Sequence, residues 1–104
     1  MEKNINESVK NWFLYVILCS DERLYTGITT NINRRWRQHC GDLKNGAKFF
    51  RGRKPKKLLF VESFEDRSTA SKREYAIKKL TRVNKLLLIT TEINLVKEFK
   101  LNNK

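Results

Sequence analysis

The chain has 104 residues, enough for one domain with a single hydrophobic core and too few for two. Lys and Arg number 23 against 11 Asp and Glu, so the formal net charge is +12 and nucleic acid is the first candidate partner. A membrane is not expected as the partner, because the longest apolar runs, WFLYVIL and LLLI, are too short to span a bilayer. The opening segment MEKNINESVK has no hydrophobic signal region, which predicts a cytoplasmic protein. Cys19 and Cys40 lack CxxC spacing and a second histidine, which argues against a structural zinc site.

The first predicted elements form a β-hairpin. Residues 1–10 are polar and expected to be flexible. Residues 11–19 and 24–28 are rich in aromatic and β-branched side chains, and the segment between them has the composition of a turn. Both sets of alternating side chains in the first strand are apolar, so both faces of the sheet should be covered. Gly27, inside the second strand, indicates the close approach of a backbone or a ligand.

A helix is predicted over residues 32–43, with its N-cap at Thr30 or Asn31. Its apolar residues recur at helical spacing and form one stripe. Arg35 lies at the edge of this stripe, and His39 lies inside it, one turn later. The helix is therefore expected to turn a cation and an imidazole toward the sheet.

The second half of the chain begins with a basic surface loop. Residues 44–57 contain seven Lys or Arg, two Phe and the only Pro, and no regular pattern. The remaining predicted elements are a strand over 58–64, a long helix from Asp66 or Ser68 to about Arg82, a short helix over 83–89, and a final amphipathic segment or mobile tail over 92–104.

Glu74 is the most informative carboxylate, because it lies at the margin of the apolar arc of the long helix. A carboxylate that points partly inward is costly unless a cation satisfies it, and a metal ion would do so. The alternative is an ordinary ion pair with Lys78, one helical turn further on. Spacing alone does not choose between these two interpretations.

Four other side chains are candidates for chemistry on a phosphodiester. Arg35 could hold a phosphate through bidentate hydrogen bonds, or it could be a solvated member of a basic cluster. His39 could carry protons, or it could be a hydrogen-bonded core residue. Tyr15 and Tyr25 could reach the same site with their hydroxyl groups, or they could be packing residues of the strands.

The basic loop is interpreted as a contact with nucleic acid. Its cations can neutralise phosphates, and an exposed aromatic ring can stack on an unpaired base. Phe49 and Phe50 could instead anchor the loop to the core. A further basic stripe on the later helix could track a nucleic-acid backbone or be a solvated face; it comprises Lys72, Arg73, Lys78, Lys79, Arg82 and Lys85.

Taken in order, these motifs resemble a known family. Five segments together resemble the GIY-YIG nuclease domain, in its small stand-alone bacterial branch. They are the tripeptides Phe13-Leu14-Tyr15 and Tyr25-Thr26-Gly27, the run from there to Arg35 and His39, the loop 47–55 and the segment 66–80. The resemblance covers about residues 11–90. Phe13 and Leu14 replace the glycine and isoleucine of the first motif. The family's later asparagine has its nearest candidate in Asn84, whose spacing from Glu74 is too short to count.

The resemblance implies an α+β fold with a three-stranded antiparallel sheet flanked by helices. It further implies a flexible N-terminus (1–10), a nuclease-like domain (11–90) and a C-terminal helix or tail (91–104). The expected activity is that of a metal-dependent endonuclease acting on DNA rather than RNA. Two alternatives are a nucleic-acid-binding protein with little activity on the same scaffold and, less favoured, a protein-interaction module.

The resemblance also implies a role for each site residue. Glu74 would bind Mg²⁺ or Mn²⁺, Arg35 would grip the phosphate, and Tyr15 would orient or deprotonate the attacking water. Tyr25 and His39 would complete the hydrogen-bond network, and Gly27 would let the helix pack close to the strand. The residues expected to contact nucleic acid are Arg34, Arg37, Lys48, Phe49, Arg51, Arg53, Lys54 and Lys78.

Overall fold

The computed structural model describes residues 11–99; residues 1–10 and 100–104, which include the expected flexible N-terminus and the end of the expected tail, lie outside the described part. The elements in chain order are β1 (Trp12–Cys19), β2 (Leu24–Thr29), α1 (Ile32–Cys40), the 3₁₀ turn η1 (Lys48–Phe50), β3 (Pro55–Phe64), α2 (Arg67–Lys78), α3 (Arg82–Ile89) and the 3₁₀ turn η2 (Val96–Glu98). Within residues 11–99, none of the helices combines the length and the apolar content that crossing a membrane requires.

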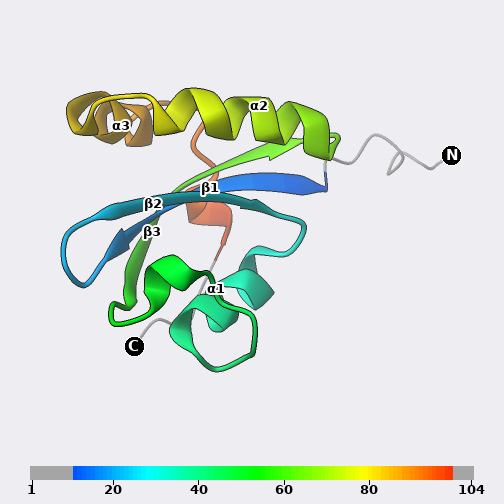
Figure 1. The fold of residues 1–104 in the computed structure, drawn as a ribbon. Coiled ribbons are helices and arrows are strands. Elements are labelled where there is room, and N and C mark those ends of the chain that lie inside the picture. The colour runs from blue at the N-terminus through cyan, green and yellow to red at the C-terminus, as the bar shows by residue number, and fades with distance from the viewer. Residues whose placement is uncertain (1–10, 100–104) are drawn as a thin grey trace, which may run out of the picture.

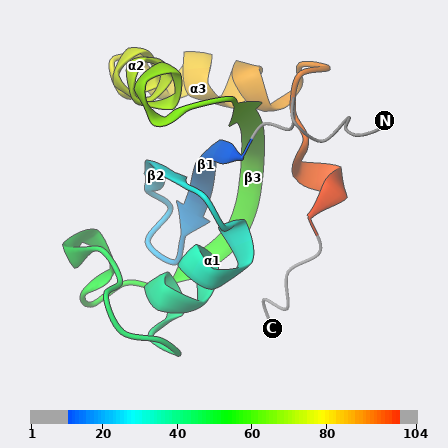
Figure 2. The ribbon, with the colours of Figure 1, turned by 90° about the vertical axis from the view of Figure 1, so that its right-hand side faces the viewer.

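The three strands form one antiparallel sheet with the order β2-β1-β3. The central strand β1 carries Tyr15, which lies opposite Gly27 of β2 on one side and Val61 of β3 on the other. This arrangement confirms the predicted α+β class and the predicted hairpin. Helices α2 and α3 lie on one side of the sheet and α1 lies on the other (Figures 1 and 2).

The alternation of β1 divides the core into two clusters. Tyr15 and Ile17 point to the face that α1 and η2 cover, while Leu14 and Val16 point to the face that α2 and α3 cover. Both faces are therefore buried, as the apolar character of both sets of side chains predicts. Helix α1, which carries Arg35 and His39, and helix α2, which carries Glu74, consequently lie on opposite sides of the sheet.

Element boundaries differ from the expectations where a cap intervenes. Helix α1 ends at Cys40 rather than at residue 43, because Gly41 adopts the left-handed conformation (φ 91°) and its N–H binds the carbonyl of Gln38. The expected long helix ends at Lys78 rather than at about Arg82, and the expected short helix starts at Arg82, where the side chain of Thr81 caps it by accepting from the Asn84 N–H at 3.2 Å. Strand β3 starts at Pro55, a first strand position at which proline is tolerated.

The segment after α3 seals the outer edge of β3. The amide of Asn94 accepts from the Val61 N–H (3.1 Å) and donates to the Leu59 carbonyl (2.9 Å), as a neighbouring strand would. The Leu95 N–H donates to the Val61 carbonyl at 2.8 Å. Leu95, Val96 and Phe99 then pack against the core on the α1 side of the sheet.

Candidate active site

The centre of the candidate site is a buried hydrogen bond between β1 and α1. The Tyr15 hydroxyl lies 2.8 Å from Nε2 of His39, and both side chains are almost fully buried. On the other side of the imidazole, the backbone N–H of Ala47 donates to Nδ1 at 3.4 Å. An accepting Nδ1 places the ring proton of the neutral imidazole on Nε2, so His39 donates to the phenol oxygen. The hydroxyl proton of Tyr15 is then directed away from His39.

Gly27 provides the space that this phenol occupies. A Cβ atom at position 27 would lie 2.5 Å from the Tyr15 hydroxyl oxygen and 2.8 Å from Cζ. The third nearest atom belongs to the Tyr25 ring. The expectation that Gly27 lets the helix approach is therefore corrected: the nearest atoms across the glycine are those of the two tyrosines.

An aromatic wall surrounds the imidazole. The Tyr25 ring lies 5.3 Å from His39 and 4.9 Å from Phe50, measured between centroids, and Phe50 lies 4.2 Å from His39. Phe50, from η1, thus helps to hold the imidazole in place. The sequence had indicated only that Phe50 could anchor the loop to the core. Contacts of this kind come from residues far apart in the chain, and no local spacing reveals them.

Burial keeps both members of the central pair neutral. Desolvation and the neighbouring Tyr25 raise the pKa of Tyr15 well above its usual value, while the Arg35 guanidinium opposes this shift. Desolvation, together with the charge of Arg35, lowers the pKa of His39 to about 4. At neutral pH the site therefore holds a phenol and an uncharged imidazole beside a permanent cation.

Arg35 is positioned by two neighbours that the sequence patterns did not single out. Its Nη1 donates to Oε1 of Gln38 at 2.8 Å and to the backbone carbonyl of Asn45 at 2.9 Å. Gln38 follows Arg35 by three residues, a spacing at which helical side chains meet, so it could have been found. Asn45 sits in the loop with a positive φ of 76°, and nothing in the sequence indicates its contact.

Glu74 stands apart from this cluster in its contacts. It extends from α2, in the layer on the other side of the sheet, and its Oε2 lies 3.0 Å from Nζ of Lys78. Within residues 11–99, no hydrogen bond or ion pair joins it to Tyr15, Arg35 or His39. The ion pair weighed as an alternative is therefore present.

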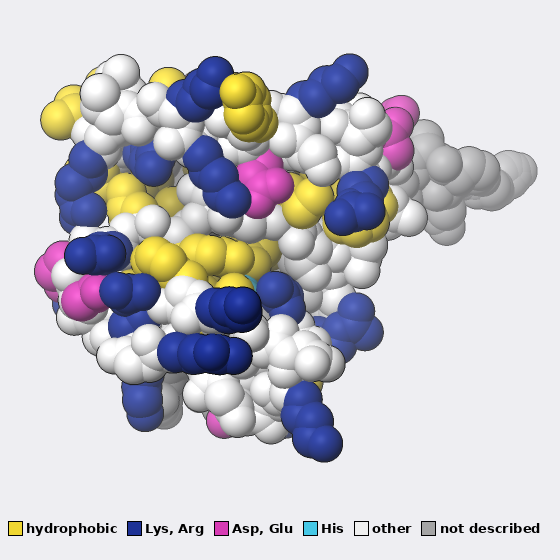
Figure 3. All heavy atoms as spheres, viewed as in Figure 1, with side chains coloured by type: hydrophobic (Ala, Val, Ile, Leu, Met, Phe, Trp, Pro, Cys, Tyr) yellow, Lys and Arg dark blue, Asp and Glu magenta, His cyan; other side chains and the backbone are white. Residues whose placement is uncertain are grey.

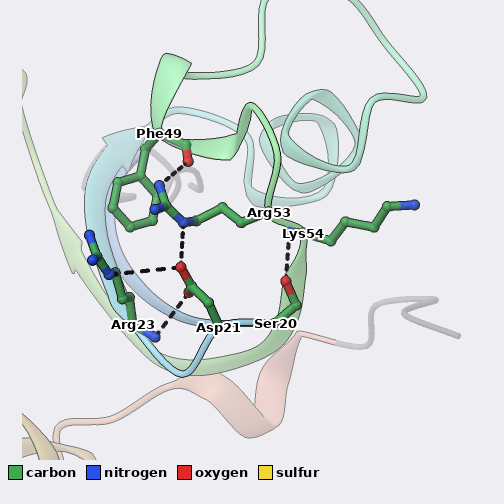
Figure 4. Close-up of polar contacts among 6 residues, drawn as sticks. All are labelled: Ser20, Asp21, Arg23, Phe49, Arg53 and Lys54. Atoms are coloured by element: carbon green, nitrogen blue, oxygen red, sulfur yellow. Dashed lines mark hydrogen bonds and ion pairs between the residues drawn. The ribbon is translucent and has the colours of Figure 1, made fainter.

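Arg53 and Phe49, both expected to contact nucleic acid, contact each other and the hairpin turn (Figure 4). The Arg53 guanidinium donates to Oδ2 of Asp21 at 2.7 Å and to the Phe49 carbonyl at 2.6 Å, and it lies 4.3 Å from the centroid of the Phe49 ring. These contacts tie η1 to the turn of the hairpin and favour the anchoring interpretation of Phe49. The Lys54 side chain extends away from this cluster.

The other residues expected to contact nucleic acid are at the surface. Lys78 is exposed but pairs with Glu74. The remaining exposed cations in this set are Arg34, Arg37, Lys48, Arg51 and Lys54. They belong to α1, to η1 and to the loops around them.

Comparison with known proteins agrees with this geometry. The family model described as the GIY-YIG catalytic domain matches residues 11–86. The chain belongs to the GIY-YIG family. This confirms the resemblance inferred from the two tripeptides and the downstream motifs. The GIY-YIG domain is that of a nuclease family, and it indicates nucleic acid as the ligand.

Individual relatives support the same assignment. The UPF0213 protein DP2720 of Desulfotalea psychrophila is 51% identical over 78 residues, which cover 75% of this chain and 70% of that protein. The UPF0213 protein CPE1444 of Clostridium perfringens is 48% identical over 80 residues, covering 77% and 84%. These names state a family and no activity.

Two solution NMR structures share the fold. The UPF0213 protein BH0048 of Bacillus halodurans has a TM-score of 0.51 and 32% identity, with 83% of this chain and 89% of that chain covered. The protein EF2693 of E. faecalis has a TM-score of 0.51 and 36% identity, with 76% and 85% covered.

Proposed function

We propose that this GIY-YIG chain is a divalent-metal-dependent endonuclease that hydrolyses phosphodiester bonds of DNA. The observation that carries the proposal is the gathering of Tyr15, Tyr25, Arg35 and His39 from β1, β2 and α1 around one buried hydrogen bond. A guanidinium held in a fixed orientation suits the non-bridging oxygens of a phosphate, whose charge grows as the P–O bond is displaced.

Tyr15 is the group that would act on the attacking water. In the resting protein it is a neutral phenol, so it can orient water but cannot accept a proton. Two features of the chain favour the phenolate that a base requires: the positive charge of Arg35 and the hydrogen bond from Nε2–H of His39. Both act against the effect of burial, which still keeps the phenol protonated in the resting protein.

Glu74 is the residue that would hold the metal ion. Mg²⁺ is commonly bound through one or two carboxylates, with water and substrate phosphate completing its shell. Within residues 11–99 there is no group of three or more His, Cys, Asp or Glu suited to a metal, so a single carboxylate fits Mg²⁺ or Mn²⁺ better than a metal that needs a closed protein site. Lys78, whose side chain is 54% exposed, would have to move aside. When bound, the ion would neutralise developing charge and lower the pKa of its water.

A nucleic-acid-binding protein with little cleavage activity is the second candidate. The ion pair between Glu74 and Lys78 favours it, because a carboxylate already neutralised has less affinity for a cation. The basic surface would serve such a protein equally well. The two candidates differ in one measurable property, the cutting of the bound strand.

The test uses end-labelled single-stranded, duplex and branched DNA, and RNA of the same sequence, with Mg²⁺ or Mn²⁺. The variant is Glu74→Gln, and the matched control is Glu92→Gln, which removes an exposed carboxylate elsewhere. We expect Glu74→Gln to lose at least about 100-fold in cleavage rate, the size of a lost electrostatic stabiliser, and to keep its binding. Glu92→Gln should cut normally.

Two results would contradict the endonuclease. Cutting that survives in Glu74→Gln would point to a contaminating enzyme or to a metal held elsewhere. Firm, salt-sensitive binding by the unmodified chain without cutting of any substrate would establish the binding protein instead.

A further inference from the structure

A recess adjoins the candidate site at the start of α1. It has a volume of about 420 Å³ and lies between Arg34 and Arg35 of α1 on one side and Arg67 and Trp12 on the other. Arg67 is the first residue of α2, and Trp12 is the first residue of β1. In Figure 3, basic side chains stand above and below a recess between α2 and α1. The recess therefore connects the two helical layers at one end of the sheet.

The chemistry of the lining selects an anion. Three guanidinium groups border the recess and no carboxylate does. The nearest carboxylate in sequence, Asp66, accepts hydrogen bonds from the N–H and the Oγ1–H of Thr69, both at 2.8 Å, and so is committed to capping α2. Like charges gathered around one hollow raise its positive potential, which attracts an anionic ligand.

Arg67 is held in place for such a ligand. Its guanidinium carbon lies 5.9 Å from the centroid of a Trp12 ring, within the range of a cation–π contact. A guanidinium that already rests on an indole loses less freedom on binding than one on a free side chain. Its donors can then form charge-assisted hydrogen bonds with phosphate oxygens.

We propose that this recess binds a second phosphate of the nucleic-acid strand, next to the phosphate that Arg35 grips. Arg35 borders both the recess and the catalytic cluster, so one strand can pass from one to the other. A volume of about 420 Å³ lies in the range of ligand pockets and leaves room for the sugar that joins the two phosphates. The inference rests on the proposed function, and it adds Arg67 and Trp12 to the residues that bind the substrate.

The first test measures binding without metal, so that it does not depend on cleavage. Arg67→Gln is compared with Arg23→Gln, because both remove one exposed guanidinium and Arg23, in the hairpin turn, is not among the residues expected to contact nucleic acid. The slope of log affinity against log salt should fall by about 0.9 for duplex DNA, or about 0.7 for a single strand, in Arg67→Gln. Arg23→Gln should leave the slope unchanged. Equal slopes in the two variants would overturn the subsite, whether or not the protein cuts DNA.

The second test locates the phosphate. Oligonucleotides in which a single phosphate is replaced by a neutral methylphosphonate are cut by the unmodified chain, with the replacement moved along both sides of the cut. One position adjacent to the cut should slow cleavage. In Arg67→Gln, and in Arg34→Gln on the opposite wall, the same replacement should have no additional effect, because the contact is already lost. A penalty that persists unchanged in both variants would overturn the proposal, and thermal melts verify that both variants fold.

The two inferences fail separately. A fall in slope specific to Arg67→Gln without any cleavage would leave the phosphate subsite standing and sink the endonuclease. Cleavage with no change in slope would support the endonuclease and overturn the phosphate subsite.

Discussion

The hydrogen bond from His39 to the Tyr15 oxygen sets the protonation of the site at the scale of single residues. The imidazole is flanked by the Phe50 ring and the Ala47 N–H, and it lies near Arg35. Burial, reinforced by the charge of Arg35, makes a positive charge on the imidazole unfavourable and so lowers the pKa of His39. His39 therefore acts as a neutral donor.

The sole histidine should make stability depend on pH between about 4 and 6.5. In this window the unfolded chain binds a proton that folded His39 does not, so stability rises with pH. Acidification from pH 7 to pH 4 should cost the native chain roughly 2–3 kcal/mol more than it costs His39→Gln, from a pKa difference worth about 1.4 kcal/mol per unit. Urea unfolding at several pH values measures this.

The comparison with His39→Gln isolates the imidazole. The carboxyls of Asp21 and Asp66 have pKa values below their usual range, because Arg53 and the Thr69 N–H respectively bind their charged forms. They contribute stability that is lost as the pH falls further, and they do so equally in both proteins. Parallel curves for the two proteins would contradict the assignment of a neutral, buried His39.

Gly27→Ala should disrupt the site without unfolding the domain. The added methyl group meets the Tyr15 hydroxyl at 2.5 Å, so the phenol must move and its bond to His39 must lengthen. We expect a destabilisation of about 1–3 kcal/mol, as for other overpacked positions, and an upward shift of the His39 pKa in an NMR titration.

A double variant tests the cause of this effect. Tyr15→Phe removes the atom nearest to the new methyl group, so Gly27→Ala should cost less in that background than alone. Simple additivity would show that the glycine is needed for another reason.

At the scale of elements, the Asn94 side chain supplies hydrogen bonds to the outer edge of β3, where no neighbouring strand of the sheet within residues 11–99 pairs. Its amide is shared among the Val61 N–H, the Leu59 carbonyl, the Ile89 carbonyl and the Val96 N–H. The side chain thereby links β3, the end of α3 and η2. Polar groups of a strand edge that lose such partners must find water or another chain.

Asn94→Ala should therefore destabilise the domain by about 2–3 kcal/mol, since it leaves several partly buried backbone groups without partners. Asn84→Ala is the matched control, because Asn84 is exposed at the start of α3 and its change should fall within about 0.5 kcal/mol. Chemical denaturation of both variants decides the matter. Equal midpoints would mean that the backbone pairing of Leu95 alone closes the edge.

The elements themselves were largely predictable because their signals are local. Alternating apolar residues identified β1, and helical spacing placed Arg35 and His39 on one side of α1. The separate short helix was also predicted, but the early end of α1 and the start of α3 at Arg82 depend on caps at Gly41 and Thr81, which the periodicity of apolar residues does not contain. The role of Asn94 depends on a partner more than 30 residues away, and no local pattern encodes it.

At the scale of the whole molecule, the charge of +12 should give stability and binding opposite responses to salt. Added NaCl screens the repulsion among surface cations and should raise the melting temperature of the free protein. The same salt should weaken DNA binding steeply, because the counterions displaced from DNA gain less entropy when they enter a more concentrated salt solution. Melts and binding titrations across 50 to 200 mM NaCl, the range in which phosphate contacts respond strongly, measure both. A melting temperature that falls with salt would show that the cations are largely paired.

The candidate site was predictable only in part, because some of its contacts join residues that are far apart in the sequence. The motifs led to Tyr15, Tyr25, Arg35 and His39, which the sheet and α1 bring together. The sequence could not show that Lys78 forms an ion pair with the carboxylate of Glu74, because the helical spacing also allows that carboxylate to face a metal. The sequence also did not reveal that Arg67 lies beside Trp12. The two residues are close because the start of β1 pairs with the end of β3.

The seal on β3 has a consequence for how the protein is made. Residues 94–99 follow every strand and helix of the domain, and the ribosome releases the chain from its N-terminus at about 5–20 residues per second. The outer edge of β3 in the nascent sheet is therefore exposed until residues 94–99 have been released. During this interval a neighbouring nascent chain could pair with that edge instead. Slow translation over this stretch should therefore increase misassembly during synthesis, even though the finished protein has the same sequence.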